Sequence, residues 1–180
     1  MKKLIGLMLF AVTLAVAQPT RREESRPTTP EQDSKPNSDA VPDGYAIQSQ
    51  FERVVILRFK YKADLLASME KVIEQEGIKN AVILSAIGSV RNYHVHSVSN
   101  REFPSKNMFT KDPMAPADIV GMNGYVIDGR IHAHMTMTNE EHAFGGHLEP
   151  ETNVFTFVII TLGVLPDDVD LTKIDDKTYR

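Results

Sequence analysis

The sequence predicts one compact domain of the α/β class, in its α+β type, with one principal helix beside several strands. Residues 45–180 have the length of a single domain. Within them only one stretch, Leu65–Ile73, carries apolar residues at the spacing of a helix face. The other apolar stretches alternate with a period of two or form short continuous runs, which is typical of strands.

The segment at the start of the chain is predicted to lie outside the fold. Lys2 and Lys3 precede an apolar run, Leu4–Val16, and Ala15-Val16-Ala17 has the small residues of a cleavage site. Met1–Ala17 is therefore predicted to be a secretory signal peptide, which places the mature protein in the periplasm or outside the cell. An uncleaved membrane anchor is the alternative, but the apolar run is short for a bilayer span.

Residues 18–44 are predicted to form a disordered linker. They are rich in polar and charged residues and contain few large apolar side chains, so they cannot bury enough surface to offset the entropy lost on ordering. The segment also contains five prolines: Pro19, Pro27, Pro30, Pro36 and Pro42.

Composition excludes some classes of site. The chain contains no cysteine, which excludes disulfides, thiolate metal ligands and cysteine nucleophiles. Its net charge is −4, and loss of Lys2 and Lys3 with the signal peptide would make it −6. An acidic chain without an extended basic run is a poor match for the phosphate contacts that nucleic-acid-binding proteins make.

The domain is predicted to begin with a strand followed by the helix. Phe51–Tyr61 alternates apolar and polar residues, as a half-buried strand does. Asp64 is the expected N-cap of the helix, and Gly77 stands where a C-terminal cap belongs.

Two strands are predicted next, with a break between them. Asn80–Ile87 is a continuous apolar run, which indicates a buried central strand. Gly88-Ser89 interrupts the run, and Arg91–Ser99 is predicted to be a separate strand with His94 and His96 on one face.

The remaining elements frame a histidine-rich stretch. Arg101–Pro116 is predicted to be a long loop, either a flap over a site or part of a subunit contact. Ala117–Tyr125 is the next strand, and Asp128-Gly129 marks a turn after it. Thr152–Leu162 is apolar on both faces, so we expect a second subunit to cover one of them. The acidic tail, Pro166–Arg180, is expected to be peripheral.

Four of the six histidines fall within Gly129–Leu148. The first half of this stretch alternates like a strand and places His132 and His134 on one face. Gly145-Gly146 in the second half indicates a bulge or a close backbone approach.

The second half of the stretch is predicted to return as a partner strand. If Asn139-Glu140 forms a two-residue turn, His147 lies opposite His132 and diagonal to His134. A turn one residue longer would move His147 to the other face of the hairpin.

Three convergent imidazoles suit a metal ion. Three neutral histidines leave a fourth tetrahedral position open, as catalytic zinc sites do, and water bound there becomes a nucleophile near neutral pH. We therefore predict a metal site, with zinc as the metal, at His132, His134 and His147. The alternative is that these histidines lie on a solvated strand face, because the His-x-His pattern is common by chance.

Other residues are candidates for supporting roles at this site. Alternative ligands, or groups that contact the ligands, are His94, His96 and His142. A general base would come from the acidic residues that flank the site, none of which is favoured over the others: Glu102, Glu140 and Glu141.

Several features recur in a characteristic order: the Asp-capped helix, Ala81-Val82-Ile83, Gly88-Ser89-Val90, Arg130-Ile131-His132-Ala133-His134, and then Gly145-Gly146-His147-Leu148. Over about Phe51–Leu165 this order resembles the PPC (plants and prokaryotes conserved) domain family. The two histidine motifs are the most specific part of the resemblance.

The resemblance implies a mainly antiparallel sheet, association as homotrimers, and a metal site at the three matching histidines. Plant relatives bind AT-rich DNA through a separate AT-hook, and prokaryotic relatives often share the DNA-binding label. This chain lacks an Arg-Gly-Arg-Pro hook, and its signal peptide would place it away from chromosomal DNA. A function inherited from the fold alone is therefore in doubt.

The sequence thus predicts an exported, homotrimeric protein with a three-histidine zinc site and an unidentified small-molecule ligand or substrate. DNA binding, as the family label implies, and zinc-dependent hydrolysis are the alternatives. No catalytic residue is assigned, and no stable membrane span is expected after cleavage.

Overall fold

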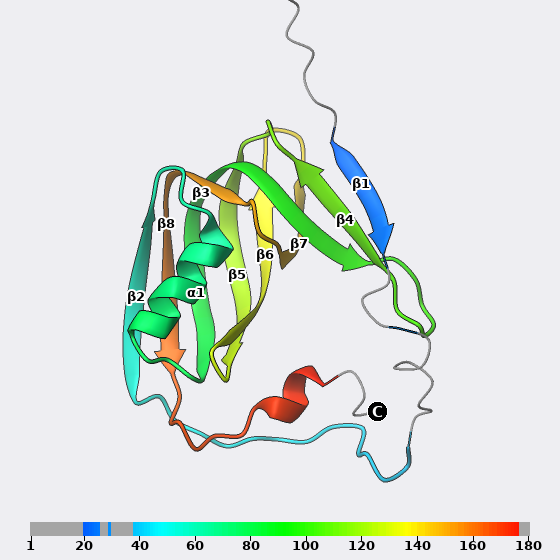
Figure 1. Cartoon of the computed structure of the whole chain (residues 1–180), viewed down its shortest axis with the longest axis vertical. Helices are drawn as coiled ribbons and strands as arrows, with labels where there is room; N and C mark the ends of the chain where they lie inside the picture. The colour runs from blue at the N-terminus through cyan, green and yellow to red at the C-terminus, as the bar shows by residue number, and fades with distance from the viewer. Residues whose placement is uncertain (1–19, 26–28, 30–37, 177–180) are drawn as a thin grey trace, which may run out of the picture.

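The structure, a computed structural model, describes residues 20–25, 29 and 38–176 (Figure 1). The predicted signal peptide, Met1–Ala17, lies outside the described residues. In the described part of the chain, no helix combines the length and apolarity needed to cross a bilayer. The elements are β1 (Arg21–Ser25), β2 (Arg53–Lys60), α1 (Leu65–Gln75), β3 (Ala81–Val98), β4 (Asn107–Asp112), β5 (Ala117–Ile127), β6 (Arg130–Thr138), β7 (Ala143–Leu148), β8 (Asn153–Val164) and a 3-10 helix, η1 (Thr172–Asp175).

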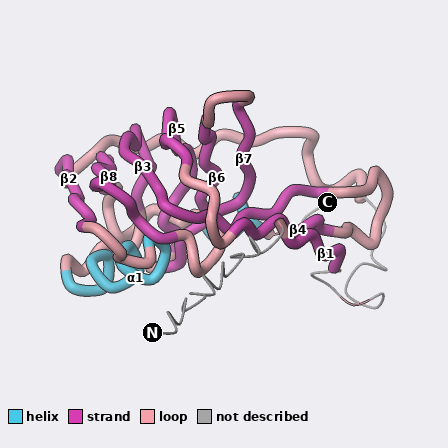
Figure 2. Tube along the Cα trace, turned by 90° about the horizontal axis from the view of Figure 1, so that it is seen from above, coloured by secondary structure: helices cyan, strands magenta, loops and turns pink. Residues whose placement is uncertain are grey.

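The described strands form one antiparallel sheet organised around β3 (Figures 1 and 2). The first half of β3 pairs with β5 and β8, and its second half pairs with β4 and β7. Because β5 also pairs with β6, and β6 with β7, the strands β3, β5, β6 and β7 form a closed circuit of hydrogen-bonded neighbours. The predicted mainly antiparallel sheet with one principal helix agrees with this arrangement.

β3 runs unbroken through Gly88, so the predicted division into two strands is wrong. Gly88 adopts φ +145°, and a Cβ at this position would lie 2.1 Å from the carbonyl oxygen of Phe157. Directly after this glycine the register against β8 shifts, between Gly88 and Val90 and again between Val90 and Asn92. The glycine therefore marks an irregular stretch of a long strand without ending it, and one strand serves both halves of the sheet.

Helix α1 has the predicted caps. The Asp64 side chain accepts a hydrogen bond from the Ala67 backbone N–H at 3.1 Å, and Gly77 follows the helix with φ +62°. The helix lies along the face of the sheet formed by β2, β8 and β3 (Figures 1 and 2). Its fully buried side chains belong to the main apolar core: Leu65, Met69 and Ile73.

Two segments predicted to lack regular structure contain strands. Asn107–Asp112, inside the predicted loop Arg101–Pro116, is β4 and pairs with β3. Arg21–Ser25, inside the predicted linker, is β1 and pairs with β4. β1 is entirely polar, and in β4 the two apolar residues, Met108 and Phe109, are adjacent, so the apolar alternation that marks the other strands is absent. The domain limits themselves stay a prediction.

The turn between β6 and β7 is longer than predicted. Asn139 accepts hydrogen bonds at its Oδ1 from the backbone N–H groups of Glu141 and His142, both at 3.0 Å, and four residues separate the strands. His147 therefore pairs with His134 and not with His132. Because the shift amounts to two residues, His147 still lies on the predicted face.

β8 buries one face and leaves much of the other open. Val158 and Ile160 are fully buried, whereas Phe155 and Phe157 are 47% and 37% exposed. The expectation that a second subunit covers this open face stays a prediction.

Candidate metal centre

Three histidines lie in one row across neighbouring strands. His134 on β6 pairs with His147 on β7, which pairs with His96 on the second half of β3. His132 precedes His134 by two residues and shares its face of β6. The His147 ring centroid lies 4.8 Å from that of His132, 5.2 Å from His134 and 4.6 Å from His96. The structure thus brings the three predicted residues together and adds His96 to them.

The separation of two ring nitrogens fits a shared metal ion. The Nε2 atoms of His132 and His134 are 3.2 Å apart. Two imidazole nitrogens bound at 2.0–2.1 Å to one tetrahedral zinc ion would be about 3.3 Å apart. When no ion is bound, one of these two Nε2 atoms must carry a proton that it donates to the other. If neither carried a proton, two lone pairs would face and repel each other. A metal ion can replace that proton with little movement of either ring.

Asp175 of η1 orients the first of these rings. Its Oδ1 lies 2.7 Å from Nδ1 of His132, and its Oδ2 lies 2.7 Å from Nη1 of Arg130. By accepting the Nδ1–H of His132, the carboxylate leaves Nε2 of that ring as the ligand atom. The Asp175 side chain is only 14% exposed. The expectation that the acidic tail is peripheral is therefore wrong for this residue.

His147 and His134 are favoured in the neutral form that binds metal. The pKa of His147 is lowered from 6.5 to about 4, first by burial and then by the nearby imidazoles, although Asp175 opposes the shift. Burial, followed by His132 and His96, also lowers the pKa of His134. No described residue forms a hydrogen bond with the His147 ring, so the ring nitrogen that lacks hydrogen remains available as a ligand.

A second group of ligand-type side chains adjoins the first. His96, His147 and Glu149 each place one potential ligand atom within 4.8 Å of the others, as do His132, His134 and His147. Oε1 of Glu149 lies 2.5 Å from Nδ1 of His96, and the two side chains are 19% and 18% exposed. His147 is common to both groups.

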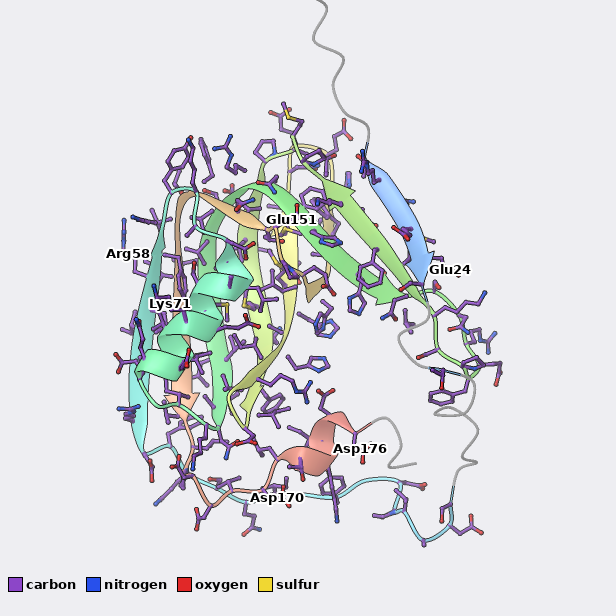
Figure 3. All side chains as sticks on the ribbon, in the orientation of Figure 1. Glu24, Arg58, Lys71, Glu151, Asp170 and Asp176 are labelled. Carbon is purple, nitrogen blue, oxygen red and sulfur yellow. The ribbon has the colours of Figure 1, made fainter. Side chains whose placement is uncertain are left out.

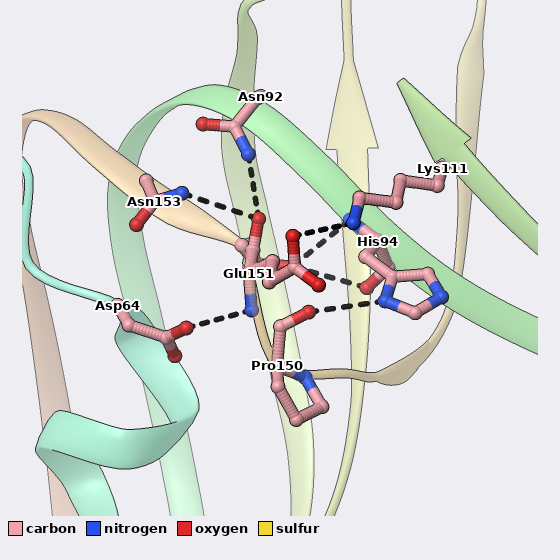
Figure 4. Close-up of polar contacts among 8 residues, drawn as sticks. Asp64, Asn92, His94, Lys111, Pro150, Glu151 and Asn153 are labelled. Carbon is pink, nitrogen blue, oxygen red and sulfur yellow. Dashed lines mark hydrogen bonds and ion pairs between the residues drawn. The ribbon is translucent and has the colours of Figure 1, made fainter. Parts of the chain in front are cut away.

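The other two histidines proposed as alternatives lie elsewhere. His94 contacts the carbonyl oxygen of Pro150 through Nδ1 at 3.0 Å (Figure 4). His142 lies in the β6–β7 turn, and its side chain is 59% exposed. Only His96 among the alternative histidines belongs to either group.

The connection that follows Glu149 is held by several polar contacts (Figure 4). Asp64 Oδ2 accepts a hydrogen bond from the backbone N–H of Glu151 at 2.6 Å, and Asn92 Nδ2 donates to its carbonyl oxygen at 2.5 Å. Lys111 forms an ion pair with the Glu151 carboxylate. These contacts tie the connection to the start of α1, to β3 and to β4, and so restrict the position of Glu149.

The acidic residues predicted as general bases do not belong to either group. Glu140 and Glu141 lie in the β6–β7 turn, beyond Thr138, which is four residues or roughly 13 Å along β6 from His134. Glu102 lies in the connection between β3 and β4, where its carbonyl oxygen accepts a hydrogen bond from Asn100.

Sequence reasoning missed Asp175 and Glu149. Asp175 contacts a histidine 43 residues away, and no local pattern marks such a contact. Glu149 stands directly after the Gly-Gly-His-Leu motif, so its proximity in sequence to His147 was the one available signal.

A pocket of about 510 Å³ opens beside the histidines. This volume falls within the range of small-molecule sites. The pocket lies between η1 and the strands β5 and β6, and it is lined by Asn123, Gly124, Tyr125, Ile127, His132, His134, Ile174 and Asp175.

A sequence model of the Plants and Prokaryotes Conserved (PCC) domain, the PPC domain named above, matches residues 46–166. The chain belongs to this family. The matched part of the PCC domain contains both groups of ligand-type residues, while Asp175 lies beyond it. A search of the curated proteins found no match.

Solved structures share the fold of this PCC domain. A metal-containing protein from Archaeoglobus fulgidus is 24% identical, with a TM-score of 0.57 over 67% of this chain and 86% of that chain. A PPC protein from Pyrococcus horikoshii is 23% identical, with a TM-score of 0.56 over 68% and 85%. A hypothetical protein from Salmonella enterica is 19% identical, with a TM-score of 0.58 over 68% and 83%.

Proposed function

We propose that this PCC-domain protein binds a zinc ion through His132, His134 and His147. The observation that carries the proposal is the 3.2 Å separation of the His132 and His134 Nε2 atoms, with Asp175 holding Nδ1 of the first ring. His147 supplies the third nitrogen from the adjacent strand. All three side chains project from a hydrogen-bonded sheet, which restricts their relative positions before an ion arrives.

The donor set favours a borderline transition metal. Imidazole ligands suit zinc, copper, iron and nickel, whereas magnesium and calcium prefer oxygen ligands. Three protein ligands on a tetrahedral ion leave one position for water or a small molecule. The pocket beside His132 and His134 gives such a molecule room to bind. The metal content named for the Archaeoglobus fulgidus protein of the same fold agrees with the proposal.

The two alternatives have less support. DNA binding would require a basic surface, but the net charge is −4, and the labelled basic side chains, Arg58 and Lys71, share one view with labelled acidic ones such as Glu151 and Asp170 (Figure 3). Zinc-dependent hydrolysis would require a base for the bound water. The nearby carboxylates, Asp175 and Glu149, already contact histidine nitrogens.

Elemental analysis tests the zinc site. The protein without a histidine tag is incubated with one equivalent of zinc and desalted, and about one zinc per chain is expected to remain. His132→Ala, His134→Ala and His147→Ala should each lose most of this tightly bound ion on desalting, because each removes one of three ligands. His142→Ala is the matched control, since this ring is exposed and outside both groups. Full retention of zinc by His147→Ala would refute the ligand assignment.

We further propose that the protein is a homotrimer. The outer face of β2, β3 and β8 exposes apolar side chains that a second subunit would cover, and they are Val54, Ile56, Ile87, Phe155 and Phe157. Light scattering of the mature protein is expected to give three times the mass of one chain. A mass close to that of one chain would count against self-association.

Export completes the proposal. It rests on the sequence of Met1–Ala17, with its two lysines, apolar run and small-residue cleavage site. The mature protein is expected to start at Gln18 and to be recovered outside the cytoplasm, which N-terminal sequencing of fractionated cells would check.

A further inference from the structure

A second cluster of metal-type ligands lies against the proposed zinc site. We infer that His96, Glu149 and His147 hold a second divalent cation, with His147 shared between the two positions. A neutral imidazole offers one lone pair, so the His147 ring would release its remaining N–H proton to solvent when the second ion binds and then use one ring nitrogen for each ion. The inference extends the proposed function because it uses His147. Its other two ligands are independent of His132 and His134, so the two assignments can fail separately.

The donor set of this second position differs from that of the first. Two imidazoles and one carboxylate form the ligand set of several catalytic zinc sites and of many non-haem iron sites. The carboxylate of Glu149 supplies a negative charge that the three-histidine group lacks. This charge offsets part of the repulsion between two cations held a short distance apart.

Neighbouring rings restrict the His96 side chain. On adjacent strands, His147 and Phe109 both pair with His96, from β7 and β4 respectively. The His96 ring stacks on His147 with centroids 4.6 Å apart and planes at 27°, and Phe109 packs against it at 4.8 Å. The ring is therefore held between two strands, which lowers the entropy cost of using it as a ligand.

The backbone that carries Glu149 is also fixed. Its N–H donates to the carbonyl oxygen of His94 at 3.1 Å, directly after β7. Two residues later, Asp64 and Asn92 bind the backbone of Glu151 (Figure 4). Both ends of the short segment from Glu149 to Glu151 are thus attached to the sheet or to α1.

A small movement of the Glu149 carboxylate would allow it and His96 to bind one cation in place of their present hydrogen bond. Glu149 Oε1 and His96 Nδ1 are 2.5 Å apart, which is a hydrogen-bond distance. Two ligand atoms on one tetrahedral ion would be about 3.3 Å apart. The terminal torsion of a glutamate rotates over a broad range, so the carboxylate can open by this amount or present its other oxygen. The cation would then take the place of the proton between the two groups.

The two positions should differ in affinity. The second ion approaches a cation already bound nearby, and it must displace the contact between Glu149 and His96. We therefore expect the three-histidine position to fill first and the second position to fill only with excess zinc.

Zinc titration by calorimetry, with elemental analysis at saturation, tests the inference. The wild-type protein is expected to bind two ions per chain. Glu149→Gln and His96→Ala should each bind one, and His132→Ala should also bind one. Glu141→Gln and His142→Ala are matched controls on the exposed turn and should bind two. Thermal melting of each metal-free variant shows whether it is folded.

The possible results distinguish the two assignments. One ion in the wild type that Glu149→Gln and His96→Ala retain would overturn the second position and leave the three-histidine site intact. Two ions in Glu149→Gln would also overturn it, because the second ion would then lie elsewhere. One ion that His132→Ala retains and Glu149→Gln loses would support the second ligand set and contradict the first. No bound zinc would contradict both.

Discussion

Zinc is expected to raise the melting temperature of the wild-type protein and to have little effect on His147→Ala. An ion that binds only the folded state stabilises it by about 4 kcal/mol at a free concentration of roughly 1,000 times Kd. His147 belongs to both groups of ligands, so its loss removes a nitrogen from each. Replacing residues that merely orient a ligand already weakens metal binding by about 10–100-fold, so we expect a loss of more than about 100-fold here.

Thermal melting with and without zinc measures this effect. The metal-free forms of the wild type and of His147→Ala should melt at similar temperatures, because no described residue forms a hydrogen bond with the His147 ring. His142→Ala should retain the full zinc-induced shift. An unchanged shift in His147→Ala, with a normal metal-free melting temperature, would show that zinc binds elsewhere.

Asp175→Ala is expected to weaken zinc binding at the three-histidine position by about 10–100-fold, as loss of a carboxylate behind a ligating histidine usually does. Without this carboxylate, His132 loses the 2.7 Å contact that selects its Nε2 as the ligand atom. Asp175→Asn should have a smaller effect, because the amide oxygen can still accept the Nδ1–H. Competition with a chelator of known affinity measures both constants.

A residue in the same tail provides the control for this prediction. Asp170 accepts its hydrogen bonds from Thr172 and belongs to neither group of ligands, so Asp170→Ala should bind zinc as the wild type does. The position at His96 and Glu149 should be little affected by Asp175→Ala, since Asp175 contacts neither residue. Wild-type affinity in Asp175→Ala would mean that the tail does not orient His132.

Local sequence patterns predict the regular parts of this fold well. Alternation identifies β2 and β5, and Asp64 with Gly77 marks the ends of α1. The patterns fail where geometry depends on distant contacts. The sequence at Gly88 predicts the end of a strand. In the structure β3 continues through this residue because it stays paired with β8 on both sides of an irregular stretch. β4 lacks apolar alternation and forms a strand through its pairing with the second half of β3 and with β1.

The candidate site was predictable in its residues but not in its pairing. The face of His147 was predicted from a two-residue turn at Asn139-Glu140, and the longer turn changed the pairing by an even number of residues, which preserves the face. Asp175 could not be found in the same way, because a sequence separation of 43 residues gives no periodic signal. Arg130, which also contacts this carboxylate, lies within the first histidine motif, but the motif does not indicate its partner.

Because β1 pairs with β4, part of the segment that precedes the PCC domain belongs to its sheet. Five residues of β1 lie along β4, and Thr20 and Glu24 add side-chain contacts to Asp112 and Lys106. A protein shortened to begin at residue 45 would leave β4 with unpaired backbone groups, and such bare strand edges promote adhesion between molecules. With β1 in place, β1 itself forms this edge, and its charged side chains disfavour pairing between molecules. We therefore expect β1 to protect the molecule against aggregation along this border, beside the strand that carries His96.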